Sequence, residues 1–260
     1  MTTASRTVTA CATVALLLVP GRAFAQEDKT VVEIAPLYLW AARVTGHVAL
    51  DDQSVPIFMD FKNAAKKLTG AFTVHAEVRR GRWGVLSDVN FVRLSTSTSF
   101  TTPILGLPVA GTAKEDATIF EAGVSYLVKP GTNFSLIGGL RTYTLSPRYE
   151  FAATDPPLPA VDGSGTAVGV FGGFMYRPKL SDKVAFLSRA DVGGGEAFSW
   201  SATLGFDFRF KPWLGAFVGY RGLGIDTGNV PRNGTVVKNL QYALTQYGPA
   251  ASLTFRWKQK

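Results

Sequence analysis

The stretch Tyr247–Trp257 alternates strictly between two kinds of residue, and this alternation most limits how the chain can fold. One set of positions is apolar and ends in aromatics: Tyr247, Pro249, Ala251, Leu253, Phe255 and Trp257. The positions between them are small or polar: Gly248, Ala250, Ser252, Thr254 and Arg256. Because successive side chains of a strand point to opposite faces, the pattern predicts a strand with one apolar and one polar face. A soluble sheet could also contain such a strand.

Nine further segments alternate in the same way, which brings the predicted strands to ten. They are Val31–Val44, Gly70–Arg80, Trp83–Leu94, Ala113–Lys129, Phe134–Leu145, Thr166–Arg177, Val184–Gly193, Ser199–Phe210 and Trp213–Gly224. Strands of this length match the roughly 9–11 residues that cross a bilayer. No apolar run reaches the roughly 18 residues that a membrane-spanning helix needs.

The connections alternate between tight turns and longer segments. Tight turns are expected near Arg80, Pro130, Pro178 and Pro212, and longer links at 45–69, 95–112, 146–165, 193–198 and 225–239. Within 45–69 we expect a short hairpin about Asp51–Gln53, followed by one or two helical turns in 60–68. Short turns on one rim and long loops on the other are typical of outer-membrane barrels. The fold class is therefore predicted as all-β, a transmembrane antiparallel up-and-down β-barrel of ten strands, with eight or twelve as alternatives.

The first 25 residues have the pattern of a secretory signal peptide. Arg6 precedes the apolar run Val14–Val19, and Ala23-Phe-Ala25 fits the small-x-small cleavage site. Residues 26–260 would then form a single barrel domain. Cys11 is the one cysteine and precedes the apolar run, which argues against a lipoprotein and leaves the mature chain without thiols. The mature chain would carry 25 basic and 19 acidic residues. The basic residues are scattered, which argues against nucleic acid as a partner.

Several short motifs, in this order, resemble the small outer-membrane β-barrel proteins called OmpA-like or porin-family barrels of unassigned activity. The motifs are Tyr38-Leu-Trp40, Gly81-Arg-Trp-Gly84, Gly138-Gly-Leu-Arg141, Arg189-Ala-Asp-Val-Gly-Gly194, Gly219-Tyr-Arg221 and Gly248-Pro249 with Leu253–Trp257. The chain departs from the pattern by lacking an arginine near Met175 and by continuing three residues past Trp257. The resemblance implies a monomer in the cell outer membrane, surrounded by lipid and lipopolysaccharide and inserted by the barrel-assembly machinery.

Ten charged residues on the polar faces are the candidate functional set. They are Glu77, Arg79, Asp88, Glu121, Arg141, Arg189, Asp191, Asp207, Arg209 and Arg221, five acids and five bases. Inside a narrow barrel they could form a structural network of salt bridges, or a charged constriction that selects small solutes. We expect no catalytic, cofactor-binding or metal-binding residues. The predicted function is non-enzymatic, either structural in the envelope or a narrow passage for small solutes.

The alternative is a surface enzyme, either a protease or a lipid A-modifying enzyme, or an adhesin, working through the long loops. His47 could act as a general base helped by Asp51 or Asp52, whereas His75 is expected in the lumen near Glu77. Aromatic residues near strand ends, Tyr38 and Trp40 among them, are expected to anchor the barrel at the membrane interface.

Overall fold

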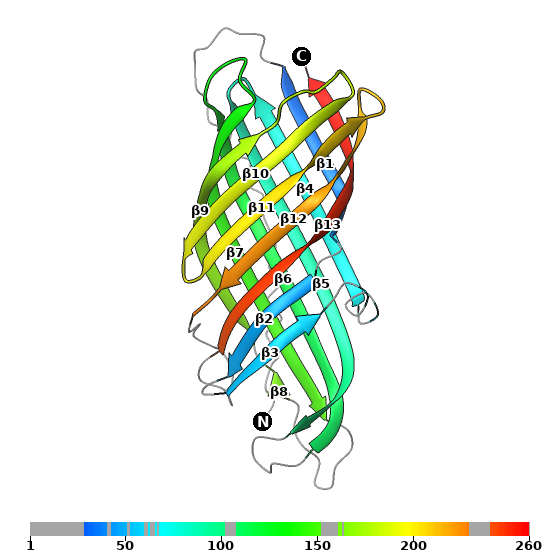
Figure 1. Cartoon of the computed structure of the whole chain (residues 1–260), viewed down its shortest axis with the longest axis vertical. Coiled ribbons are helices and arrows are strands. Elements are labelled where there is room, and N and C mark those ends of the chain that lie inside the picture. Colours follow the sequence, from blue (N-terminus) through cyan, green and yellow to red (C-terminus); the bar gives the residue numbers. More distant parts are fainter. Residues whose placement is uncertain are drawn as a thin grey trace, which may run out of the picture.

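Ten antiparallel strands close into a barrel in the computed structural model (Figure 1). The structure describes residues 29–40, 43–50, 53–59, 62, 66, 68–101, 108–151, 161–162, 164–228 and 240–259. The barrel strands are β1 (Thr30–Trp40), β4 (Leu68–Arg80), β5 (Trp83–Thr101), β6 (Pro108–Leu127), β7 (Phe134–Phe151), β9 (Gly165–Tyr176), β10 (Val184–Gly195), β11 (Phe198–Arg209), β12 (Leu214–Asp226) and β13 (Leu240–Gln259). Strand β13 pairs back onto β1, from Thr30 opposite Gln259 to Trp40 opposite Ala250. The predicted ten-stranded barrel is thus confirmed.

The predicted tight turns all lie on one rim, where the ends of β1 and β13 also meet. Gly81 and Gly131 adopt φ values of 59° and 81° there, a backbone conformation that glycine reaches without a steric penalty. We call this rim the turn side and the opposite rim the loop side. In Figure 1 the turn side is at the top.

On the loop side a hairpin extends the sheet. Strands β2 (Arg43–Leu50) and β3 (Gln53–Met59) pair with each other, and β2 pairs with the first half of β13. The predicted hairpin is therefore present, but most of the segment 45–69 is not irregular. Residues 51–52, between the two strands, lie outside the described residues. Of the expected helical turns, Lys62 and Lys66 are helical.

Several strands are longer than predicted on the loop side. Strands β5 and β6 contain 19 and 20 residues, and their pairing continues to Thr101 opposite Pro108, so much of the expected loop 95–112 is strand. Strand β7 likewise runs to Phe151 and pairs with the short β8 (Val161–Asp162). The prediction ended these strands where the apolar alternation stops, but backbone pairing needs no apolar face once the strand has left the bilayer. The 193–198 link was also wrongly assigned as long, because Glu196 and Ala197 alone join β10 to β11.

The extended strand ends carry polar pairs instead of apolar faces. Arg93 donates two hydrogen bonds to Asp116, at 2.7 and 2.6 Å, and Lys114 Nζ donates to Glu150 Oε2 at 2.7 Å. The hydrogen bond from Lys114 lowers the pKa of Glu150. Such exposed pairs suit an aqueous surface beyond the membrane.

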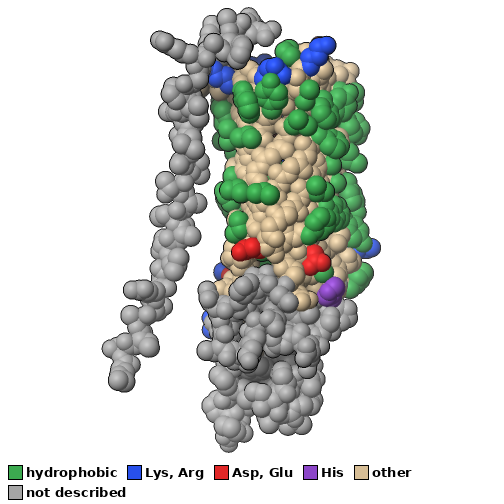
Figure 2. Space-filling model, turned by 90° about the vertical axis from the view of Figure 1, so that its left-hand side faces the viewer, with side chains coloured by type: hydrophobic (Ala, Val, Ile, Leu, Met, Phe, Trp, Pro, Cys, Tyr) green, Lys and Arg blue, Asp and Glu red, His purple; other side chains and the backbone are tan. Residues whose placement is uncertain are grey.

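The outer face of the barrel is apolar between the two rims (Figure 2). Its exposed side chains include Val85, Val124, Leu136, Leu140, Val170, Phe174, Leu204, Phe206, Val218 and Leu253. Near the turn side, aromatic rings pack against one another, with ring centroids 4.7 Å apart for Trp83 and Tyr126 and 6.4 Å for Phe255 and Trp257. A continuous apolar surface bordered by aromatics is the arrangement that a bilayer requires.

One irregularity reverses the expected facing of two aromatics in β1. The register of β1 against β13 shifts between Ile34 and Leu37, so residues after the shift change faces. Tyr38 and Trp40 therefore point into the lumen, where the Arg221 guanidinium carbon lies 5.6 and 5.1 Å from their ring centroids. Their predicted place in the interface girdle is wrong, and Leu39 is the exposed residue between them.

Candidate functional site in the barrel lumen

Six charged side chains meet at the middle of the lumen. We call them the central ion layer: Asp88, Glu121, Arg141, Arg189, Asp191 and Arg221, from β5, β6, β7, β10 and β12. Arg141 donates to Glu121 at 3.0 Å and to Asp191 at 2.6 Å. Arg189 reaches the other oxygens of the same two carboxylates, at 2.7 Å and 3.0 Å. Two arginines and two acids thus form a closed ring of charge-assisted hydrogen bonds, with Glu121 0% and Arg141 1% exposed.

Neighbouring residues complete the central ion layer. Arg221 lies 3.5 Å from Glu121, and Arg189 lies 3.5 Å from Asp88. Asp88 is also 2.9 Å from Nδ1 of His75, so His75 is a lumen residue, as predicted, but its partner is Asp88. The layer holds three arginines and three acids, so its buried charges balance.

A second set of charges lies nearer the turn side. We call it the turn-side ion layer: Glu33, Glu77, Arg79, Arg177, Asp207 and Arg256. Arg177 donates to Glu77 at 3.0 Å, and Arg256 donates to Glu33. Arg79 lies 3.6 Å from Glu77 and 3.7 Å from Glu33. This layer again contains three arginines and three acids.

Apolar side chains fill the space next to both ion layers. Leu86, Ile137, Phe171 and Met175 form a cluster between the layers. The guanidinium carbons of Arg141 and Arg189 lie 4.8 and 5.6 Å from the ring centroid of Phe171, and Arg177 lies 3.4 Å from the Met175 sulfur. A second cluster lies on the loop side of the central layer: Tyr143, Ala167, Ala197, Leu223 and Ile225, with Trp40 packed against it. The lumen is therefore packed with side chains across all four layers.

Nine of the ten predicted charged residues belong to the two ion layers. Arg209 does not: it lies at the turn-side mouth and makes no ion pair with any described acid. The prediction missed Glu33, Arg177 and Arg256, although Glu33 and Arg256 occupy inward positions of alternating strands and could have been found from that pattern. It also treated the lack of an arginine near Met175 as a departure, whereas Arg177 contacts that residue from just beyond β9.

The residues of the enzyme alternative are not gathered into one site among the described residues. His47 is exposed on β2, opposite Pro56 on β3 and Ala243 on β13. Its expected helpers Asp51 and Asp52 lie outside the described residues. Over the described ranges, no three His, Cys, Asp or Glu residues are placed to hold a metal ion. In the same ranges, no helix is both long and apolar enough to cross a membrane.

The apolar belt, the closed hydrogen bonding and the polar packed lumen together define an outer-membrane β-barrel. A closed barrel satisfies every ladder donor and acceptor within the bilayer, and its outer surface could not remain stable in water. The protein is therefore located in the outer membrane.

Comparison with known proteins supports the same fold. The outer membrane protease OmpT from Escherichia coli matches with a TM-score of 0.50 and 9% identity, over 92% of this chain and 99% of that one. Ail, the attachment invasion locus protein of Yersinia pestis, matches with a TM-score of 0.39 and 10% identity, over 89% of this chain and all of that one. Neisserial surface protein A matches with a TM-score of 0.34 and 11% identity, over 87% and 96% of the two chains. No family model and no curated protein sequence matches the chain.

Proposed function

We propose that this protein is a non-enzymatic structural barrel of the outer membrane whose lumen is closed to small solutes. The observation that carries the proposal is the ring of Glu121, Arg141, Asp191 and Arg189 across the middle of the lumen. A barrel of eight strands is filled by its own side chains, whereas 16–18 strands leave an aqueous channel. Ten strands lie close to the filled limit.

The chemistry of the ring also supports a structural role. Each carboxylate oxygen of Glu121 and Asp191 accepts a hydrogen bond from an arginine, so these groups have no free acceptor directed at a passing solute. Breaking the ring to let an ion through would leave charges unpaired in a poorly hydrated interior, at a cost of several kcal/mol. A selective constriction instead needs groups that a hydrated solute can reach.

Conductance in a planar lipid bilayer tests the proposal. We expect no steady current from the native barrel, and a current from Glu121→Ala/Arg141→Ala/Arg189→Ala, which removes the side chains that cross the lumen. The matched control is Arg93→Ala/Lys114→Ala/Asp116→Ala, which removes the same charges from the exposed strand ends. A shift in gel mobility on heating verifies that each barrel has folded.

A native barrel that conducts as well as the triple lumen variant would contradict the closed lumen and favour a narrow passage. Enzymatic function is tested separately with peptide and lipid A substrates. OmpT, a protease, has this fold, but function does not follow from fold. Turnover that His47→Ala abolishes would contradict the non-enzymatic proposal.

A further inference from the structure

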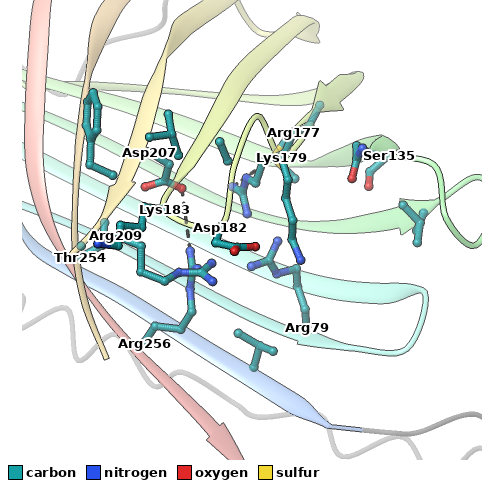
Figure 3. Close-up of a pocket in the computed structure, with 18 of the residues that line it drawn as sticks. Arg79, Ser135, Arg177, Lys179, Asp182, Lys183, Asp207, Arg209, Thr254 and Arg256 are labelled. Carbon is teal, nitrogen blue, oxygen red and sulfur yellow. Dashed lines mark hydrogen bonds and ion pairs between the residues drawn. The ribbon is translucent and has the colours of Figure 1, made fainter. Parts of the chain in front are cut away.

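A cavity of about 350 Å³ opens at the turn side of the lumen. Its walls are the links β4–β5, β9–β10 and β11–β12 together with the turn-side ends of β6 and β13, and the turn-side ion layer lies at its inner end (Figure 3). We call it the vestibule. Its volume is in the range of small-molecule sites, about 300–1,000 Å³. Because short turns face the periplasm in barrels of this type, the vestibule opens to the periplasm.

The lining of the vestibule is strongly basic. It contains nine lysines and arginines and two aspartates. Arg79, Arg177, Arg256 and Asp207 belong to the turn-side ion layer, whose charges balance. The other acid is Asp182. The remaining cations are Lys29, Arg82, Lys179, Lys183, Arg209 and Lys211.

Four of these cations have no acidic partner among the described residues: Lys179, Lys183, Arg209 and Lys211. Arg82 donates to the backbone carbonyls of Leu127 and Val128, which leaves its charge uncompensated. The central ion layer contrasts with this region, because there every buried arginine faces a carboxylate. The excess of positive charge is thus confined to the vestibule and its rim.

The cationic groups extend into one common space. Figure 3 shows Arg79, Lys179, Arg209 and Arg256 reaching into the cavity from four different segments around it, with Asp182 among them. Like charges brought together around a partly enclosed space repel one another, and a bound anion relieves that repulsion. Ser135 and Thr254 also line the vestibule and add hydroxyl donors beside the cations.

We propose that the vestibule binds a phosphate-bearing ligand from the periplasmic side. A phosphate group carries about −1.5 to −2 charges at neutral pH and offers three acceptor oxygens. It therefore offsets the excess cations better than a single carboxylate, and guanidinium groups bind its oxygens in a bidentate manner. The phosphate may come from a soluble compound or from a lipid headgroup of the inner leaflet. The proposal is independent of whether the lumen conducts.

Calorimetric titration of the full-length folded barrel with inorganic pyrophosphate tests the site. In a phosphatidylcholine nanodisc, the native barrel should bind pyrophosphate saturably. Lys183→Gln/Arg209→Gln should weaken binding by roughly tenfold for each lost cation. The matched control, Lys129→Gln/Lys258→Gln, removes two exposed lysines of the same rim that do not line the vestibule. It should leave binding unchanged.

Failure of the native barrel to bind pyrophosphate would overturn the proposal. Equal weakening in both double variants would also overturn it, because it would indicate general attraction to a basic rim. A second arm uses nanodiscs that contain phosphatidylglycerol. Weaker pyrophosphate binding there, relative to phosphatidylcholine, would identify a lipid headgroup as the competing source, and unchanged binding would identify a soluble phosphate compound. Heat-shifted gel mobility verifies that every variant is folded.

Discussion

Arg141 joins strands that lie far apart around the barrel. From β7 it bonds Glu121 on the neighbouring β6, Asp191 on β10 and Ser199 on β11, the last at 3.2 Å. A guanidinium group suits this position because it is always charged and its donors spread in one plane toward several acceptors. A lysine would supply a single point of charge and could not reach all three partners.

Arg141→Met should strongly destabilise the barrel while nearly preserving side-chain volume. Losing one member of a buried charged set leaves a carboxylate uncompensated, which costs about 3–5 kcal/mol. The free energy of unfolding, measured in denaturant after refolding into lipid, should fall accordingly. Arg93→Met, which breaks an exposed pair, should have a much smaller effect. Adding Glu121→Gln to Arg141→Met should recover part of the loss, and no recovery would show that charge balance is not the cause.

At the scale of elements, the seam between β1 and β4 is held by few backbone pairs. These strands pair only from Val31 opposite Arg79 to Ala35 opposite His75. Beyond them, the Thr73 hydroxyl accepts a hydrogen bond from the Tyr38 backbone N–H at 3.0 Å and donates one to the Tyr38 carbonyl. One side chain thus replaces two ladder bonds that the shift in β1 removes.

Thr73→Val should weaken the seam because it preserves shape but removes both hydrogen bonds. Each bond contributes about 0.5–1.5 kcal/mol, so a loss of about 1–3 kcal/mol is expected. The measurement is the temperature at which the folded band disappears on a gel, together with faster hydrogen exchange at Tyr38. Thr73→Ser retains the hydroxyl and should stay close to the native protein. If Thr73→Ser were as unstable as Thr73→Val, the hydroxyl would not be responsible.

At the scale of the whole molecule, the two rims differ in both shape and charge. The turn side has tight links, aromatic rings and the basic vestibule, whereas the loop side carries the long strand ends and the β2–β3 hairpin (Figures 1 and 2). This asymmetry gives the barrel one orientation in the membrane, with the turn side in the periplasm.

Cysteine labelling of intact cells tests this orientation. Because Cys11 is the one native cysteine and lies within the predicted signal peptide, a cysteine introduced into the barrel would be the one thiol of the mature chain. Ser164→Cys, exposed on the loop side, should react with a membrane-impermeant maleimide in intact cells. Lys129→Cys, exposed in a tight turn, should react only after the outer membrane is permeabilised. The reverse pattern would invert the assignment of the two rims and move the vestibule to the cell surface.

The period-2 alternation by itself determined the fold class, the number of barrel strands and which face of Tyr247–Trp257 points outward. These properties follow from local geometry, because a strand must place successive side chains on opposite faces and a bilayer accepts only one kind of face. The same alternation placed Glu121 and Arg141 on inward faces. It could not show that they pair, because adjacency around a barrel depends on register.

Only the tertiary structure decided the features that depend on long-range pairing. The shift after Ile34 turned Tyr38 and Trp40 inward, and the alternation of β1 carries no sign of it, since a one-residue shift reverses every later side chain. The polar ends of β5 and β6 became strand because each had the other as a partner. The balance of three arginines against three acids in each ion layer, and the unbalanced cations of the vestibule, arise from closure of the barrel, which brings residues distant in sequence into one small, poorly hydrated space.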